Sequence, residues 1–267
     1  LPGYPGLPWT AANAPTNVVL HPDRLDAPLH WRKPRRIFVN SMSDLFHEQV
    51  PNEFLDKMFA TMALAPQHSF QCLSKRPQRM LHYLTSETRP IPWHGGGRAP
   101  GLASTATRIL WEAQSACDDK VPYKEYPLGE DFAWPLPNVW LGVSVEDQRR
   151  ADERIPLLLE TPAAVRFLSV EPLLGPVDLK PYLYRCSGCG ATPCICKGAA
   201  IQWVIVGGES GPGYRRMESD WLNDVVNQCQ CAGVPVFVKQ DAGPRSGRQG
   251  RLPDDLWALK QFPKEAT

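Results

Sequence analysis

Short apolar runs alternate with helical patterns along this chain, and this alternation constrains its fold more than any other feature. Runs rich in Val, Ile, Phe and Trp predict six strands, at residues 36–40, 69–73, 138–143, 165–170, 201–206 and 234–239. Apolar residues at helical spacing predict helices at 51–64, 78–84 and 219–231, the last capped by Ser219. Asp147 is expected to cap another helix, which Pro156 would break or restart.

The strands are near-continuous apolar runs, as in strands buried on both faces. Strands that alternate with helices form parallel sheets with right-handed crossovers. The sequence therefore predicts an α/β fold, either an open doubly wound sheet or a parallel-stranded (βα) partial or full TIM-type barrel. With 267 residues, of which 43% are apolar, we expect one barrel domain over residues 1–267.

Two segments interrupt the alternation. Residues 86–137 are rich in Pro and Gly, with one possible helix near 106–116, and we interpret them as an insertion. Residues 184–199 form a second, Cys-rich insertion. No apolar run approaches the roughly 20 residues that a membrane-spanning helix needs, so no membrane partner is expected. The formal net charge of +1 argues against a globally basic nucleic-acid coat.

Half of the eight cysteines lie within eleven residues, in the segment CSGCGATPCIC. Four thiolates in one short loop can surround Zn²⁺ tetrahedrally or hold an iron–sulfur cluster. We therefore predict a metal site, with zinc ahead of iron–sulfur; free or partly oxidised surface thiols are the alternative. The spacing also favours a reducing compartment, and hence a cytoplasmic protein. The predicted ligands are Cys186, Cys189, Cys194 and Cys196.

Small polar or charged residues follow every predicted strand. In parallel α/β folds, ligands bind at the carboxyl ends of the strands, so these residues are expected to form one shared binding site. Ordinary helix caps and turns are the alternative reading of each position. The candidates are Asn40, Ser43, Asp44, Lys75, Arg76, Ser144, Glu146, Ser169, Glu171, Gly207, Gly208, Glu209, Ser210, Lys239 and Gln240.

The loop GGESGPG at residues 207–213 is the most distinctive of these strand ends. Its glycines permit a close backbone approach or a positive φ, and its N–H groups could cradle a carboxylate or a phosphate. It lacks the spacing of the dinucleotide fingerprint and the lysine of the P-loop. Glu209 could accept hydrogen bonds from ribose hydroxyls or an amino group; a tight turn with a solvated Glu is the alternative. Arg245, Arg248 and Arg251 lie in a Gly-rich tail that could contact a polyanion.

The strand-end motifs, in order, are RIFVNSMSDLF, LSKRPQRM, NVWLGVSVEDQ, RFLSVEPLLGPVDL, WVIVGGESGPGYRRM and GVPVFVKQ. Over about residues 20–240 this set resembles a phage and bacterial three-cysteine-motif family of radical-SAM-like proteins, similar in style to spore photoproduct lyase. The resemblance implies a barrel of the radical-SAM kind that binds S-adenosylmethionine and a [4Fe–4S] cluster. A 5′-deoxyadenosyl radical would then abstract hydrogen from the substrate, and the candidate residues above would line the barrel mouth and bind the cofactor.

One departure from the family pattern concerns the cluster. Family members carry a CxxC followed by Tyr-Ala near the N-terminus, and residues 1–50 hold no cysteine. We expect either that this sequence lacks its beginning or that this member has lost the cluster. The Cys186–Cys196 loop would hold zinc or a second iron–sulfur cluster.

The sequence leaves three functions open. The first is a radical-SAM-type enzyme acting on a nucleotide or nucleic acid. The second is a zinc-stapled, non-catalytic barrel that binds nucleic acid or a partner protein. The third is a hydrolase that uses carboxylates as acid–base groups, namely Asp44, Glu146, Glu171 and Glu209.

Overall fold

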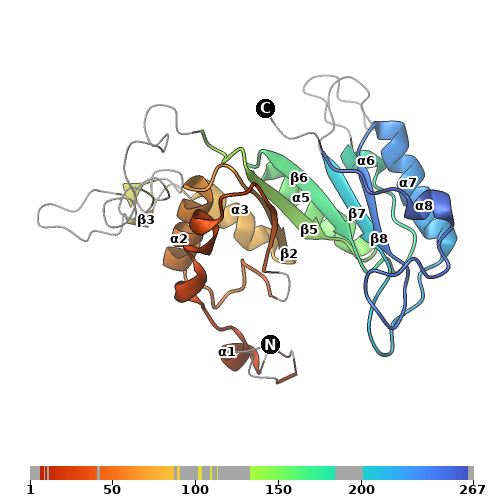
Figure 1. The fold of residues 1–267 in the computed structure, drawn as a ribbon, viewed down its shortest axis with the longest axis horizontal. Coiled ribbons are helices and arrows are strands. Elements are labelled where there is room, and N and C mark those ends of the chain that lie inside the picture. Colours follow the sequence, from red (N-terminus) through yellow and green to blue (C-terminus); the bar gives the residue numbers. More distant parts are fainter. Residues whose placement is uncertain are drawn as a thin grey trace, which may run out of the picture. The chain divides into compact units, whose positions relative to one another are not determined.

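A computed structural model of the chain describes residues 7–8, 10, 12–40, 43–86, 89–90, 102–103, 109, 113, 133–183 and 201–263. Six strands form one sheet in the order β1-β2-β5-β6-β7-β8 (Figure 1). The strands are β1 (Arg36–Val39), β2 (Ser69–Ser74), β5 (Val139–Ser144), β6 (Val165–Val170), β7 (Trp203–Gly207) and β8 (Val236–Gln240). The helices of four or more residues are α1 (Ala14–Asn17), α2 (Asn52–Ala63), α3 (Pro77–Thr85), α5 (Gln148–Glu160), α6 (Lys180–Leu183), α7 (Ser219–Ala232) and α8 (Asp254–Trp257).

The strand order follows the chain order without a reversal. A doubly wound sheet reverses its order at a switch point, whereas a (βα) barrel does not. The registers of β1 with β2, and of β5 through β8 with one another, are parallel. Because β1 and β8 are the two ends of the described sheet, the α/β fold is that of an open, partial barrel. The prediction of a parallel α/β fold is confirmed.

The chain divides into two compact units. The first comprises Leu1–Cys72 and His82–Val139, and the second comprises Leu73–Leu81 and Trp140–Thr267. This division does not decide the expectation of one barrel domain over residues 1–267, which stays a prediction. No helix in the described part is both long and apolar enough to cross a membrane.

The core of the first unit is built around α2. The rings of Phe46, Phe59 and Tyr83 pack on one another with centroids 5.6–6.5 Å apart. The Tyr83 hydroxyl donates a hydrogen bond to Asp56, 2.8 Å away, so the buried carboxylate of this helix has a partner. Helical spacing predicted the apolar face of α2, and that prediction is confirmed by the burial of Leu55 and Phe59.

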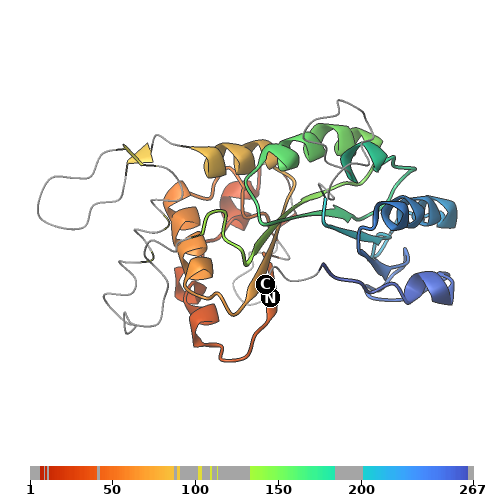
Figure 2. The same ribbon diagram turned by 90° about the horizontal axis from the view of Figure 1, so that it is seen from above.

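In the second unit, helices cover one face of the sheet (Figures 1 and 2). Helix α7 contacts β7 and β8 and buries Leu222, Val225 and Val226. On the same face, the Arg166 guanidinium of β6 donates hydrogen bonds to the carbonyl oxygen of Leu158, near the end of α5, and to that of Thr161, which follows the helix. Alternate residues of each strand point to the opposite face.

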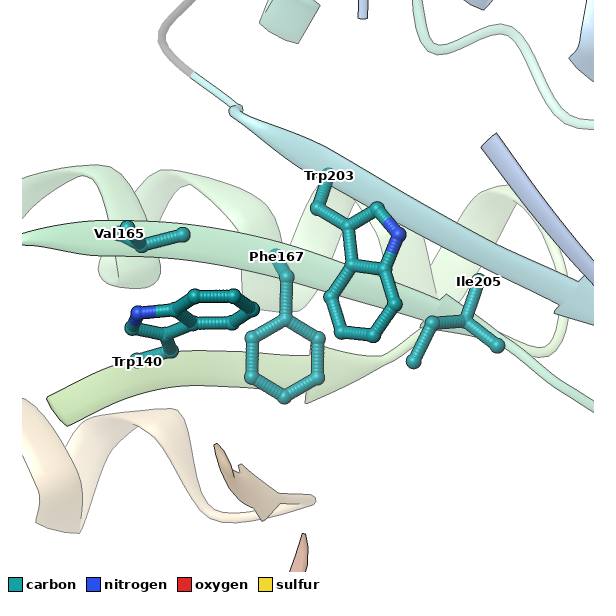
Figure 3. Packing of buried hydrophobic residues seen from close by; sticks show 5 residues of the cluster. All are labelled: Trp140, Val165, Phe167, Trp203 and Ile205. Atoms are coloured by element: carbon teal, nitrogen blue, oxygen red, sulfur yellow. The ribbon is translucent and has the colours of Figure 1, made fainter. Parts of the chain in front are cut away.

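That opposite face carries a cluster of buried aromatic side chains, Trp140, Phe167 and Trp203, which we call the aromatic floor. Figure 3 shows Trp140, Phe167 and Trp203 together on this face; the indoles of Trp140 and Trp203 pack edge to face with centroids 5.9 Å apart, and the Phe167 ring packs on Trp203 at 5.6 Å. The C-terminal segment closes over them, because Phe262 packs on Trp203 at 5.1 Å and the Trp203 indole N–H donates to the carbonyl of Gln261. The part of this face near the amino ends of the strands is therefore filled by side chains.

Two details of the predicted helices are wrong. Helix α5 runs through Pro156 without a break. The proline removes one N–H donor, but Ile155 and Leu158 are both fully buried and hold the helix on either side of it. Ser219 is the first residue of α7, and Glu218 is the residue before it, without a side-chain cap.

The two predicted insertions are described only in part. Within residues 86–137, β3 (Arg89–Pro90) and β4 (Leu102–Ala103) pair antiparallel. Ile109 and Ala113, from the region of the expected helix, are helical and buried. Residues 184–199 lie outside the described part of the chain.

Candidate functional site

Side chains of the second unit form layers from the aromatic floor to the carboxyl ends of the strands. The registers pair Gly142 with Phe167, and then Ser144 with Ser169. One further alternation places Glu146 and Glu171 on the same face, beyond the serines. The polarity of the sheet face therefore changes along the strands from aromatic rings to hydroxyls to carboxylates.

Two serines of this face are buried residues. Ser144 and Ser169 are 3% and 4% exposed. No hydrogen bond joins either hydroxyl to the residues that the structure describes, and neither oxygen is among the side-chain atoms that are fully buried without a partner. Each hydroxyl therefore keeps some access to solvent, and two register-matched hydroxyls of this kind can donate to or accept from a ligand.

Glu146 follows β5 and pairs with two cations. Its carboxylate lies 2.7 Å from Lys75 Nζ and 2.9 Å from Arg154 Nη1. Arg154 also donates to the Ser144 carbonyl, which fixes the guanidinium against the end of the strand. Helix α5 supplies Arg154, and Asp147 starts that helix by accepting the N–H of Arg150, so the predicted cap is confirmed.

The exposure of these three side chains differs. Glu146 and Arg154 are each 13% exposed, whereas Lys75 is 55% exposed. One carboxylate oxygen of Glu146 is therefore held from the protein side, and the other faces a cation that reaches into solvent. A ligand ammonium can take the place of Lys75 without disturbing Arg154.

Glu171 follows β6 and pairs with Lys239 of β8. The carboxylate lies 2.9 Å from Lys239 Nζ. Strand β7 lies between the two strands in the sheet, and at this level it presents Gly207, which has no side chain. Glu171 is 17% exposed and Lys239 is 48% exposed, so again the carboxylate is mostly buried and the cation is accessible.

Glu209 follows β7, and its side chain binds Arg215 further along the same loop. Its carboxylate accepts hydrogen bonds from the Arg215 guanidinium at 2.7 and 2.8 Å and from the Arg215 backbone N–H at 2.7 Å. These bonds lower the pKa of Glu209 to about 2, so it stays ionised at neutral pH. A hydrolase that used Glu209 as its general acid is not supported by this geometry. The hydrogen bonds to Glu209 raise the pKa of Arg215, and the Glu146 carboxylate adds a smaller contribution in the same direction.

The glycines of the 207–213 loop serve its own packing. A Cβ on Gly208 would lie 2.2 Å from the backbone N of Ala242, and Gly211 and Gly213 have φ of 118° and 74°. The N–H groups of Gly208 and Gly211 donate to the carbonyls of Gln240 and Gly243. Both expected uses of glycine, close approach and positive φ, are confirmed, and these two N–H groups are taken by the protein.

Of the remaining candidates of the second unit, Gln240 and Ser210 lie beside or within this loop, and Arg76 lies at the start of α3. The Gln240 side chain is buried, donates to the Gly208 carbonyl and accepts from the Gly247 N–H. Ser210 forms a parallel bridge to Gly243. The N–H of Arg76 donates to the Ser74 hydroxyl at the start of α3.

Three predicted site residues belong to the first unit, where they form the turn after β1. Asn40 has φ of 57°, a left-handed conformation that Asn tolerates. The Ser43 N–H donates to the Asn40 carbonyl, and Asp44 accepts the N–H of Phe46. Their part in a shared site stays a prediction.

The predicted metal ligands Cys186, Cys189, Cys194 and Cys196 lie outside the described residues. Among the residues that the structure describes, no group of three or more His, Cys, Asp or Glu could hold a metal ion. Cys72 is buried in β2, and burial raises the pKa of its thiol to about 12. Burial likewise raises the pKa of Cys229 to about 12, whereas Cys231 is exposed.

Sequence reasoning missed Arg154 and Arg215, which hold two of the carboxylates. A repeated pattern at three successive strand ends marks the carboxylates that these arginines bind, because a small residue stands two positions before each glutamate. The pattern is Ser144-Val145-Glu146, Ser169-Val170-Glu171 and Gly207-Gly208-Glu209.

Comparison with known proteins identifies a family but no characterised relative. No curated protein and no solved structure matches the chain. Residues 6–254 match the family described as Protein of unknown function (DUF5131). The match covers most of the chain, including all six strands of the sheet. The chain therefore belongs to the DUF5131 family.

Proposed function

We propose that this protein is a radical-SAM-type enzyme that binds S-adenosylmethionine at the carboxyl ends of β5–β8 and acts on a nucleotide or nucleic acid. The stack of serines beneath carboxylates carries the proposal. Ser144 and Ser169 are largely buried residues whose hydroxyls form no hydrogen bond to the described part of the protein, and Glu146 and Glu171 lie one alternation further along the same strands. The resemblance to radical-SAM-like proteins supports the choice of ligand.

S-adenosylmethionine fits the charges of this rim. Its ammonium and sulfonium groups are cationic, and Glu146 and Glu171 each pair with a lysine that is about half exposed. Its carboxylate matches the lysines that the ammonium would release. Ribose hydroxyls and ring nitrogens can bond to serine hydroxyls. The aromatic floor beneath excludes water from the deeper part of the same face.

The described residues do not fit an iron–sulfur cluster. They include no group of three metal-ligating side chains, and the raised pKa values keep Cys72 and Cys229 in the protonated form at neutral pH. The proposal for these residues is therefore confined to binding S-adenosylmethionine. Hydrogen abstraction, the cluster itself and metal at the cysteine-rich loop stay predictions from the sequence.

Calorimetric titration with S-adenosylmethionine tests the binding proposal. Glu146→Gln removes the charge that would bind the ammonium, and we expect at least tenfold weaker binding. Ser169→Ala is a milder second variant, for which we expect a loss of about threefold to tenfold. Glu153→Gln is the matched control, because Glu153 lies on α5 and its ion pairs within the described residues are with the surface arginines Arg149 and Arg150.

The outcomes separate the competing functions. Binding by the unaltered protein that Glu146→Gln weakens and Glu153→Gln leaves intact supports the proposal. A protein that binds no S-adenosylmethionine and contains stoichiometric zinc without iron would instead support the non-catalytic barrel.

A further inference from the structure

The loops that follow β7 and β8 form one rigid platform, which we define as residues 207–218 and 241–253 and call the paired loops. Two backbone hydrogen bonds join them, Gly243 N to Glu209 O and Gly211 N to Gly243 O, and a third joins Gly208 N of the first loop to Gln240 O at the end of β8; all are 2.9–3.0 Å long. Figure 1 shows the two loops side by side beyond the ends of β7 and β8.

Each loop is also fixed from within. Glu209 holds the first loop through its three hydrogen bonds from Arg215. Asp241 holds the second, because its carboxylate accepts from the Arg251 backbone and guanidinium. Arg251 also donates to the Met217 carbonyl, which ties the second loop to the first. The acidic side chains Glu209 and Asp241 are thus used to build the platform.

Most of the charged groups left at the surface of the platform are basic, and the exception is Glu218, which is half exposed and lies 3.5 Å from Arg216. The paired loops hold five arginines against three acidic residues and contain no lysine. Arg245 and Arg248 are exposed and form no ion pair within the described residues. Tyr214 is 42% exposed and stands next to Arg215 and Arg216, whose side chains are more than 60% exposed.

We infer that the paired loops bind single-stranded nucleic acid, with Tyr214 stacking on a base and Arg245 and Arg248 contacting phosphates. Guanidinium groups bind phosphate oxygens in a bidentate manner, and proteins that bind single strands combine such cations with exposed aromatic side chains. A duplex keeps its bases stacked, so the tyrosine favours a single strand. The inference rests on this surface and not on the cofactor proposal, although it would give the proposed enzyme a polynucleotide substrate.

Fluorescence anisotropy with a labelled 20-nucleotide thymidine strand, measured with the full chain over a series of salt concentrations, tests the inference. Tyr214→Ser should weaken binding about tenfold without changing the salt dependence, and Tyr214→Phe should bind like the unaltered protein. The double variant Arg245→Gln/Arg248→Gln should lower the slope of log Kd against log salt by about 1.4, since each phosphate contact on a single strand contributes about 0.7.

The matched control is Arg149→Gln/Arg150→Gln, which removes two α5 arginines outside the paired loops. It should leave the affinity unchanged, and all of these variants should keep their S-adenosylmethionine affinity. The inference is overturned if the Tyr214 and Arg245/Arg248 variants bind like the control. It is also overturned if polyglutamate of equal length competes as well as the nucleic acid, which would identify an acidic protein partner instead. Because cofactor binding is measured separately, either proposal can fail while the other holds.

Discussion

Lys239 pairs with Glu171 across an intervening strand. The two residues belong to β8 and to the end of β6, and their charged atoms lie 2.9 Å apart although β7 separates the strands. Adjacent strands are about 4.8 Å apart, so the two side chains together span about 10 Å. The two side chains can meet over β7 because the residue of β7 at this level is Gly207, which has no side chain. The pair links two strand ends that share no backbone hydrogen bond.

This link should contribute little to stability. Lys239→Met removes the cation, and we expect the free energy of unfolding to fall by less than about 1 kcal/mol, because the lysine is half exposed and solvent screens the pair. Urea unfolding measures the change. A loss of several kcal/mol would show that the link holds the sheet together rather than presenting a replaceable cation to a ligand.

Gly208 should tolerate no side chain. A Cβ there would lie 2.2 Å from the backbone N of Ala242, which has no room to move because the two loops are hydrogen-bonded. Gly208→Ala should therefore lower the free energy of unfolding by about 1–3 kcal/mol. Gly175→Ala is the control, since a Cβ at Gly175 meets nothing within 4 Å. Equal stabilities of the two variants would contradict the described packing of the paired loops.

Gly142 and Phe167 should be energetically coupled. A Cβ on Gly142 would lie 2.5 Å from the Phe167 ring, which fills the space beside it. Gly142→Ala alone should cost about 1–3 kcal/mol of unfolding free energy through overpacking. Phe167→Leu should relieve part of that clash, so the double variant should be more stable than the sum of the two single changes predicts. If the two losses of unfolding free energy were simply additive, the Phe167 ring would not be in contact with residue 142.

Glu209 should titrate far below an ordinary glutamate. Its pKa is lowered from 4.5 to about 2, first by the side-chain hydrogen bonds from Arg215 and then by that residue's backbone N–H. Because the folded pKa is lowered, the bonds stabilise the fold above about pH 4.5, and this stabilisation is lost as the pH falls toward 2. Carboxyl ¹³C NMR measures the midpoint.

Arg215→Gln should move the Glu209 midpoint back toward 4.5. Arg216→Gln is the matched control, since Arg216 is the next arginine and lies near Glu218 instead. A midpoint that responds to both substitutions equally would indicate a general field effect and not the specific bonds from Arg215.

The sheet could be predicted from the sequence because its strands are short apolar runs between turn residues. The six expected strands agree with the observed bounds to within about two residues at each end. The predicted break of α5 at Pro156 is wrong. Local preference disfavours a proline inside a helix, but the burial of Ile155 and Leu158 maintains the helix on both sides of it. Tertiary packing therefore decided what local preference could not.

The site could be predicted only in outline. Residues after parallel strands were expected at one edge, and those of the second unit do form a set of paired charges there. Their partners Arg154 and Arg215 come from a helix and a loop, and no strand rule places them. The layering of serines beneath carboxylates depends on strand register, which the sequence alone does not give.

Amide hydrogen exchange with and without saturating S-adenosylmethionine is the decisive test of the cofactor proposal, because it reports where the ligand sits. We expect slower exchange in peptides that cover residues 144–147, 169–174 and 207–211, and unchanged exchange in peptides from α7. Unchanged exchange throughout these strand ends, or slowing confined to other segments, would refute binding at the carboxyl ends of β5–β8.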